Sequence, residues 1–400
     1  MSASSSSPAN TRAIGARCRH FGSCGGCAMQ DREYPRQLEL KCERVAALLD
    51  PLGLQPSRAH GSPKTWFYRN KMEFSFGDVY PPIPGGPAVK LGLKPKGRWY
   101  EILDLAECFL LSEETPALLK AVREWAEREK LLPYNSRRHT GFLRHLVVRE
   151  GKNTGERLVL LVTAPGEFPA ESFVEAVKAV YPATTIMRGV NGKLSDTANC
   201  DSSGVLEGTG FITEALRFPG QELRFRVSPS AFFQTNTSGT ELLYGLLRDW
   251  TKEAGAKVAL DLYCGGGGIG LSLAGVCEKV IGAEVTPSAV ADARANAELN
   301  AVKNIQFFVG QVETMLPSLL AFSPDLVVVD PPRAGLHAKA LETLLESGAP
   351  QIFYVSCNPE ALARDLTRLV ERYSVFRCEV VDLFPHTEHV ETVVWLKRLG

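Results

Sequence analysis

The stretch Val258-Ala-Leu-Asp261-Leu-Tyr263-Cys-Gly265-Gly-Gly-Gly268-Ile-Gly270 is an apolar run followed directly by a glycine-rich loop. Short apolar runs bounded by turn residues are typical of buried strands. Four further runs of this kind follow, each separated from the next by a helix-patterned segment, over residues 280–284, 305–309, 325–330 and 351–356. Strands alternating with helices predict a Rossmann-like α/β fold with a mostly parallel, doubly wound sheet, which binds ligands at the carboxyl ends of its strands.

The rest of the chain divides around this domain. Residues 376–383 and 391–396 predict a closing hairpin. Ahead of the domain, an α+β pattern combines helices over 37–49 and 113–130 with strands over 64–76, 89–93, 142–149 and 157–163. The Ser-rich start has no periodicity and predicts a disordered tail. We therefore expect a tail (1–16), an α+β region (17–226) and an α/β domain (227–400).

Composition excludes several classes of protein. The 400 residues are 44% hydrophobic and 22% charged, with a formal net charge of +0, so any nucleic acid must be bound by local basic patches. No apolar run could span a bilayer, and the start lacks the apolar core of a signal peptide. We expect a cytoplasmic monomer without membrane or DNA partners. Its ten cysteines are then unsuited to structural disulfides.

The glycine loop predicts a site for an adenosine cofactor. Glycines let the backbone approach a ligand closely, and Glu284 ends the second strand, where a carboxylate accepts ribose hydroxyls. Nicotinamide dinucleotide and S-adenosylmethionine (SAM) both fit this pattern, and a phosphate cradle or a plain glycine turn are the alternatives. Asp261 and the absence of a basic residue from the loop favour SAM, which carries no phosphate.

Two further motifs end neighbouring strands. Asp330-Pro-Pro-Arg333 makes a stiff turn that fixes Asp330 at the sheet edge. In Ser356-Cys357-Asn358-Pro359, Asn358 suits a helix N-cap and Pro359 the first helical position. The helix N-terminus would favour the Cys357 thiolate and so its nucleophilicity, although a cysteine in this position can also be a small buried apolar residue.

A third motif lies near the start of the chain. Cys18, Cys24 and Cys27 form a C-x5-C-x2-C run whose glycines allow the backbone to fold tightly around a shared ligand. In a chain without structural disulfides, such a group indicates metal or redox chemistry.

These motifs in combination resemble the RNA uracil-C5 methyltransferases, which make 5-methyluridine in ribosomal and transfer RNA. The shared residues are Asp-Leu-Tyr-Cys-Gly, Asp-Pro-Pro-Arg, Ser-Cys-Asn-Pro and His386-Thr-Glu-His-Val-Glu391, and the likeness extends from Cys18 to the C-terminus. It implies that Cys357 is the nucleophile that adds to uracil C6 and that Glu391 is the base that removes the C5 proton. It also implies SAM contacts from Gln234, Tyr263, Gly265, Gly268, Glu284, Gln311 and Asp330.

The cysteines resemble one branch of this family. Cys18, Cys24, Cys27 and Cys108 match the four [4Fe-4S] ligands of the 23S ribosomal RNA enzymes, and zinc is the alternative occupant of four thiolates. The sequence departs from that branch in two ways. Only a short tail precedes Cys18, where some members carry an RNA-binding β-barrel, and Gly268 replaces an Asn, which puts one cofactor contact in doubt.

The resemblance implies an RNA substrate. A target base must leave its stack to meet both thiol and methyl donor, so we expect a single-stranded loop of 23S ribosomal RNA, with the transfer-RNA T-loop second. Arg69 and Lys71 among aromatic residues, and the basic stretch 137–149, could contact phosphates; a solvated hairpin is the alternative for 137–149. The alternative of another class is a non-catalytic iron-sulfur protein that binds RNA and senses redox state.

Overall fold

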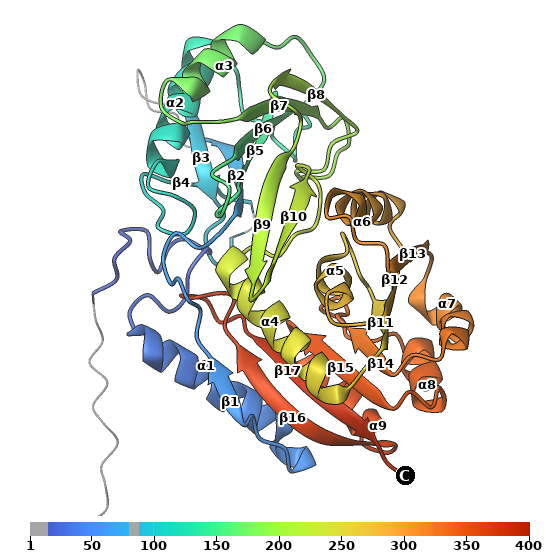
Figure 1. Ribbon diagram of the computed structural model, residues 1–400. Coiled ribbons are helices and arrows are strands. Elements are labelled where there is room, and N and C mark those ends of the chain that lie inside the picture. The colour runs from blue at the N-terminus through green and yellow to red at the C-terminus, as the bar shows by residue number, and fades with distance from the viewer. Residues whose placement is uncertain (1–14, 80–87, 99) are drawn as a thin grey trace, which may run out of the picture.

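The computed structural model of the 400-residue chain describes residues 15–79, 88–98 and 100–400. A seven-stranded sheet and an eight-stranded sheet form two lobes, and a two-stranded hairpin extends between them (Figure 1). In the described part of the chain no helix is both long and apolar enough to cross a membrane.

The eight-stranded sheet has the order β1-β16-β17-β15-β14-β11-β12-β13. Five adjacent strands, from β15 to the edge strand β13, are parallel: β11 (Val258–Leu262), β12 (Lys279–Glu284), β13 (Ile305–Val309), β14 (Leu326–Val329) and β15 (Gln351–Ser356). The last two, β16 (Tyr373–Val381) and β17 (Glu391–Arg398), form an antiparallel hairpin, with β17 beside β15. The predicted doubly wound sheet and its closing hairpin are confirmed.

Helices bury both faces of this sheet. The alternation is clear in β14, where Val327 and Val329 pack into one core and Val328 into the other. One face is covered by α4 (Thr237–Ala254), α5 (Gly268–Ala274) and α6 (Pro287–Leu299). The opposite face is covered by α7 (Val312–Leu319), α8 (Ala338–Glu346) and α9 (Pro359–Leu369), with a 3-10 turn at Leu320–Phe322.

The N-terminal part of the chain joins the same sheet. Helix α1 (Tyr34–Leu49) continues into a 3-10 turn (Asp50–Leu52), and buried Val45 and Leu49 pack into the core beneath α9. Strand β1 (Arg58–His60) then pairs in parallel with β16, with Ala59 opposite Val380. This segment precedes the central region in sequence but packs on the C-terminal sheet, an arrangement that local periodicity does not indicate.

The seven-stranded sheet has the order β4-β3-β2-β5-β6-β7-β8 and is covered by α2 (Thr115–Arg128) and α3 (Ala170–Lys178). Its strands are β2 (Lys71–Asp78), β3 (Val89–Leu93), β4 (Leu103–Asp104), β5 (Leu143–Glu150), β6 (Arg157–Thr163), β7 (Thr185–Val190) and β8 (Ser202–Glu207). The hairpin between the lobes consists of β9 (Ile212–Phe218) and β10 (Gln221–Val227).

One predicted strand was wrong in its first half. Residues 64–70 are not a strand: Phe67 has a φ of +54°, and its amide donates to the Phe109 carbonyl rather than to a sheet neighbour. The aromatic–polar alternation continues into β2, where Phe74 and Phe76 are buried in the core. The alternation therefore marks two different environments, a loop and a strand.

Candidate active site

The glycine loop between β11 and α5 is shaped by positive backbone angles. Tyr263, Gly265 and Gly267 have φ values of +63°, +51° and +83°. Asp261, fully buried at the end of β11, accepts a hydrogen bond of 2.8 Å from the Gly270 amide. The carboxylate thereby bonds to the first turn of α5 and fixes the loop against the sheet.

Glu284 ends β12 and faces the same loop. Its two carboxylate oxygens accept hydrogen bonds from the amides of Gly265 (3.2 Å) and Thr286 (2.8 Å). Both oxygens are thus oriented toward the carboxyl edge of the sheet.

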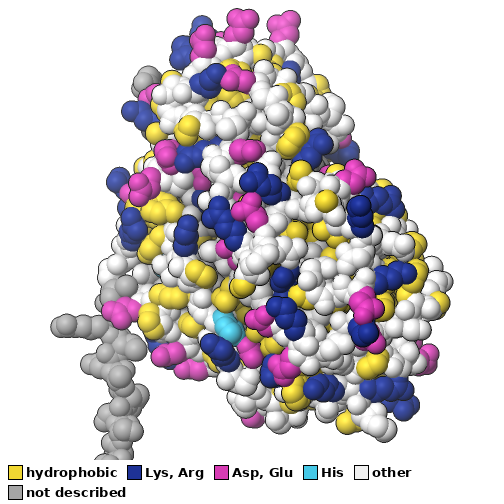
Figure 2. Space-filling view, in the orientation of Figure 1, with side chains coloured by type: hydrophobic (Ala, Val, Ile, Leu, Met, Phe, Trp, Pro, Cys, Tyr) yellow, Lys and Arg dark blue, Asp and Glu magenta, His cyan; other side chains and the backbone are white. Residues whose placement is uncertain are grey.

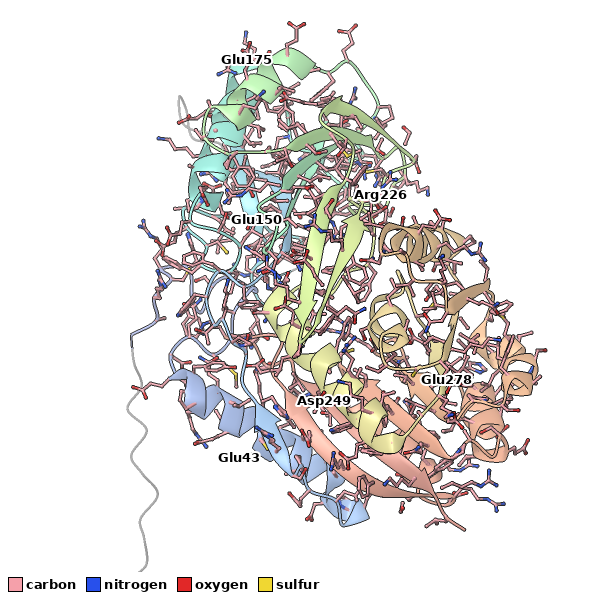
Figure 3. The ribbon with its side chains drawn as sticks, viewed as in Figure 1. Glu43, Glu150, Glu175, Arg226, Asp249 and Glu278 are labelled. Atoms are coloured by element: carbon pink, nitrogen blue, oxygen red, sulfur yellow. The ribbon has the colours of Figure 1, made fainter. Side chains whose placement is uncertain are left out.

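A cavity of about 530 Å³ opens in front of these residues. Six of the predicted cofactor contacts line it: Gln234, Tyr263, Gly265, Gly268, Glu284 and Asp330. The seventh, Gln311, is exposed at the N-terminus of α7 and is not part of this lining. Four acidic side chains line the cavity, together with one cation, Arg226 of β10 (Figure 3); the acids are Asp261, Glu284, Asp292 and Asp330.

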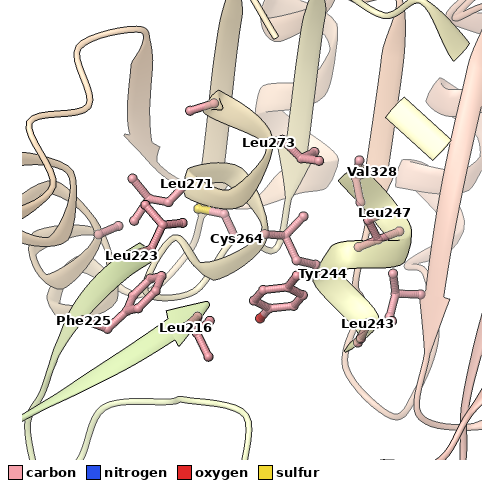
Figure 4. Packing of buried hydrophobic residues seen from close by; sticks show 14 of the residues in the cluster. Leu216, Leu223, Phe225, Leu243, Tyr244, Leu247, Cys264, Leu271, Leu273 and Val328 are labelled. Atoms are coloured by element: carbon pink, nitrogen blue, oxygen red, sulfur yellow. The ribbon is translucent and has the colours of Figure 1, made fainter. Parts of the chain in front are cut away.

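Tyr244 of α4 also lines the cavity, and its position explains the glycine at 268. A Cβ on Gly268 would lie 2.7 Å from the Tyr244 hydroxyl oxygen. The ring lies beside the glycine loop among buried apolar side chains (Figure 4). Tyr244 was not predicted from the sequence as a site residue, because its spacing along the apolar face of α4 is that of an ordinary core residue.

The Cys357 turn has the predicted local structure. The Asn358 side chain accepts a hydrogen bond from the Glu360 amide as N-cap of α9, and Pro359 begins the helix. The Asn358 amide group also donates to the Arg333 carbonyl (2.8 Å). The turn that carries Cys357 is therefore bonded directly to the turn that follows Asp330.

Strand register places Glu391 beside Cys357. The last pair of the antiparallel β15–β17 ladder is Ser356–Thr392, so Cys357 and Glu391 are the next residue of each chain segment at this end, close enough for the Glu391 carboxyl to affect the pKa of the thiol. Glu391 is buried, whereas Cys357 is half-buried.

The electrostatics of this edge differ from the expectation for a helix N-terminus. Burial, together with the carboxylates of Glu391 and Asp330, raises the pKa of Cys357 to about 11. Burial also raises the pKa of Asp330 to about 7 and that of Asp261 to about 8. The pKa of Glu391 lies well above its usual range because the carboxyl is buried and next to Asp330. The predicted preference of the helix N-terminus for the thiolate is therefore outweighed by desolvation and the nearby acids.

The four predicted cysteine ligands lie together, away from this edge. Cys18, Cys24, Cys27 and Cys108 line one small cavity with apolar neighbours that include Phe21, Leu93 and Leu105. Burial raises the pKa of Cys27 to about 12 and that of Cys108 to about 11. Among the described residues, no three Cys, His, Asp or Glu side chains converge closely enough to hold a single metal ion.

The basic stretch 137–149 has a mixed role. Arg137, Arg138 and His139 are exposed in a turn. In contrast, Arg144 is buried and donates to the carbonyls of Lys193 and Ser195, and Arg149 is buried and donates to those of Pro229 and Ala231. The last two are neither phosphate contacts nor solvated residues: they hold backbone loops, and Arg149 holds the one leading to Gln234.

A second, larger cavity of about 880 Å³ lies beside Thr235. Its lining includes Arg69, Lys71, Lys94 and Lys96 on the central lobe and Thr387, Glu388 and His389 just ahead of Glu391. Elsewhere on the face seen in Figure 2, basic and acidic side chains are interspersed and form no single positive patch.

Comparison with known proteins gives a consistent family. A family model described as tRNA (uracil-5-)-methyltransferase matches residues 198–399. An uncharacterized RNA methyltransferase of Clostridium tetani is 40% identical over 395 residues, 96% of this chain and 84% of that protein. Another, of Caldanaerobacter subterraneus, is 38% identical over 389 residues, with 95% and 84% covered.

A solved structure agrees over both lobes. The crystal structure of Pyrococcus abyssi tRNA (uracil-54, C5)-methyltransferase in complex with S-adenosyl-L-homocysteine is 30% identical with a TM-score of 0.77, covering 93% of this chain and 86% of that one. The chain therefore belongs to the tRNA (uracil-5-)-methyltransferase family of SAM-dependent RNA methyltransferases.

Proposed function

We propose that this protein methylates C5 of a specific uridine in RNA through a covalent bond between Cys357 and C6. The observation that carries the proposal is the end of the β15–β17 ladder, where a half-buried thiol and a buried carboxyl directly follow the last pair, Ser356–Thr392. Both are electrostatic neighbours of Asp330, which lines the cavity. A nucleophile and a base at one sheet edge, next to a cofactor-sized cavity, suit a reaction in which both act on one bound base.

The charges of the 530 Å³ cavity favour SAM as its occupant. The acidic lining with a single arginine disfavours the pyrophosphate of a dinucleotide and favours a cationic sulfonium and amino group, whose charge would in turn lower the raised pKa values of Asp261 and Asp330. Glu284, with both oxygens turned to the cavity edge, is placed to accept ribose hydroxyls. When bound, SAM supplies an electrophilic methyl group.

The reaction then follows from the two facing groups. The Cys357 sulfur forms a bond to C6, and the electron pair of the C5–C6 double bond moves to C5. C5 attacks the methyl group, and the sulfonium leaves as a neutral thioether. The Glu391 carboxylate takes the C5 proton, the double bond re-forms, and the C6–S bond breaks to release the thiolate.

The raised pKa of Cys357 indicates the order of the reaction steps. With a pKa of about 11, the Cys357 thiol is protonated in the free enzyme at neutral pH. A cation in the neighbouring cavity would lower that pKa, because opposite charge favours the ionised form. Nucleophilic attack is then coupled to occupancy of the methyl-donor site.

We infer that the RNA binds across the 880 Å³ cavity, with the target base extruded toward Cys357. Lys96 is exposed at this cavity and can contact phosphates, whereas Lys71 and Lys94 are paired with Glu73 and Asp196 and would have to exchange these partners. The Thr387–His389 wall leads directly to Glu391. A loop of 23S ribosomal RNA is the first candidate, on the basis of the four clustered cysteines. A transfer-RNA T-loop is the second, favoured by the likeness to the Pyrococcus abyssi enzyme.

The cysteine cavity fits the proposed [4Fe-4S] cluster in its chemistry. Four thiols face one apolar space, and the Gly26 amide donates to the Cys24 sulfur, as amides do toward cluster thiolates. Burial outweighs the nearby Arg69 guanidinium and keeps the Cys27 and Cys108 thiols protonated, so a bound cluster would be needed to stabilise them as thiolates. A brown protein that is bleached by Cys24→Ala would support iron, whereas a colourless protein containing zinc would refute it.

The substrate is tested by mapping 5-methyluridine in ribosomal and transfer RNA from a strain that lacks this protein. We expect one site to lose its methyl group and to regain it when the purified protein and SAM are added. Retention of every 5-methyluridine in the mutant strain, with no transfer in vitro to RNA from that strain, would refute the proposal.

A further inference from the structure

The loop between β16 and β17, residues 382–390, carries Glu391 at its end, and we call it the base loop. The β16–β17 ladder stops at the pair Val381–Glu391, and beyond it, among the described residues, only the Asp382 amide still bonds to a strand, at the His60 carbonyl of β1 (2.9 Å). At its centre, buried His386 has a φ of +67°, a conformation that a non-glycine residue keeps only when its surroundings hold it.

The backbone of His386 is held by the N-terminal segment. Its carbonyl accepts hydrogen bonds from the amides of Ala28 (2.8 Å) and Met29 (3.0 Å), directly after Cys27. Its amide donates to the Gln37 side-chain oxygen (2.8 Å), and the Gln37 nitrogen lies 3.1 Å from the His386 ring. Gln37 is fully buried, so these bonds are shielded from water.

Further contacts hold both sides of the same loop. Lys41 of α1 is buried and donates to the Asp382 carboxylate (2.7 Å) and the Phe384 carbonyl (2.9 Å). The Tyr68 hydroxyl donates to the Pro385 carbonyl (3.0 Å). Trp66 stacks on the His386 ring with centroids 3.7 Å apart.

We propose that residues 28–41, together with Trp66 and Tyr68, form a positioning segment that holds the base loop so that Glu391 faces the C5 proton. This inference rests on the proposed function and adds to it a role for residues that are remote from the reacting atoms. Loss of these bonds frees the loop and leaves the thiol and the methyl-donor cavity in place, so it slows proton removal more than methyl transfer. Cys27 lines the cysteine cavity and is followed directly by Ala28, the first residue of the positioning segment.

Two variants test the role with little change in volume. Gln37→Met removes the side-chain bonds to His386 together with the bond that the Gln37 amide group donates to the Arg32 carbonyl. Tyr68→Phe removes the hydroxyl that donates to the Pro385 carbonyl and is also hydrogen-bonded to the Arg69 side chain. Tyr181→Phe is the matched control: its hydroxyl is equally buried (1% exposed for each tyrosine) but donates to Glu150 of the central sheet, which is labelled in Figure 3.

The measurement follows a single turnover with RNA and methyl-labelled SAM, quenched at intervals. Methyl transfer to RNA and the protein–RNA adduct on a denaturing gel are quantified from the same samples. We expect both base-loop variants to transfer methyl at near the wild-type rate but to prolong the methylated adduct, roughly five-fold for Tyr68→Phe and by a larger factor for Gln37→Met, which loses several buried hydrogen bonds. Tyr181→Phe should match wild type.

The inference and the proposed function fail in different ways. If the adduct decays at the wild-type rate in both Gln37→Met and Tyr68→Phe, the positioning role is refuted while the mechanism stands. If Glu391→Gln forms no adduct in the same series, the mechanism itself fails. If Gln37→Met does not fold, the adduct lifetime of Tyr68→Phe tests the positioning role, because that substitution removes one hydroxyl oxygen and leaves the packing of the ring unchanged.

Discussion

The pKa of Cys357 leads to a prediction that separates two local forces. A helix N-terminus lowers the pKa of a thiol, whereas burial and neighbouring carboxyl groups raise it. With a value of about 11, the thiolate fraction of Cys357 at pH 8 is roughly a hundredfold smaller than that of an ordinary cysteine, whose pKa is about 8.5.

Alkylation by iodoacetamide measures this fraction, because only the thiolate reacts. The peptide containing Cys357 is quantified by mass spectrometry over time, and the same peptide from urea-unfolded protein gives the reference rate. We expect labelling of the folded protein at pH 8 to be roughly a hundredfold slower, and to keep rising with pH up to about 11.

Substitutions identify the groups responsible. Asp330→Asn and Glu391→Gln should each speed the labelling of Cys357, since each removes a carboxyl that raises the pKa of the thiol. Arg333→Gln should slow it, because the guanidinium lowers that pKa. A labelling midpoint near pH 7, or no response to Asp330→Asn and Glu391→Gln, would refute the reasoning and restore the helix terminus as the dominant influence.

Three further predictions concern the cavities. Gly268→Ala brings a Cβ to 2.7 Å from the Tyr244 oxygen and should lower the free energy of unfolding, measured by denaturant titration, by about 1–3 kcal/mol. The decrease should be smaller in a Tyr244→Phe background, and an equal decrease there would contradict the steric explanation. Glu284→Gln should weaken SAM binding, measured by calorimetry, roughly tenfold or more, whereas Glu278→Gln, an exposed position just ahead of the same strand, should not. Equal effects of the two substitutions would exclude a ribose contact. Lys96→Ala should reduce the salt dependence of RNA affinity by a slope of about one without altering SAM binding, and an unchanged slope would remove Lys96 from the RNA path.

Much of the catalytic sheet could be predicted from the sequence because its signals are local. Apolar runs of strand length, the glycine loop after Asp261, and the capping pair Asn358-Pro359 each record a nearby physical requirement. Parallel pairing then brings Glu284, Asp330 and Cys357 to one edge, since the carboxyl ends of parallel strands meet there.

The features that escaped prediction depend on contacts between distant segments. Pairing of β1 with β16 and burial of Gln37 and Lys41 against the base loop leave no periodic trace in sequence. From the sequence, Arg149 could be a solvated cation, whereas in the structure its guanidinium donates hydrogen bonds to loop carbonyls. For Cys357 the sequence indicated the helix N-terminus, which lowers the pKa of a thiol, but the carboxyl groups that raise this pKa come from other strands.

The central claim is that Cys357 holds uracil by C6 while Glu391 removes the C5 proton. The most direct test incubates Glu391→Gln with substrate RNA and SAM and separates the products on a denaturing gel. We predict that a protein–RNA adduct carrying the transferred methyl group accumulates, and that Cys357→Ala gives neither adduct nor 5-methyluridine. Formation of 5-methyluridine by Cys357→Ala would contradict the account.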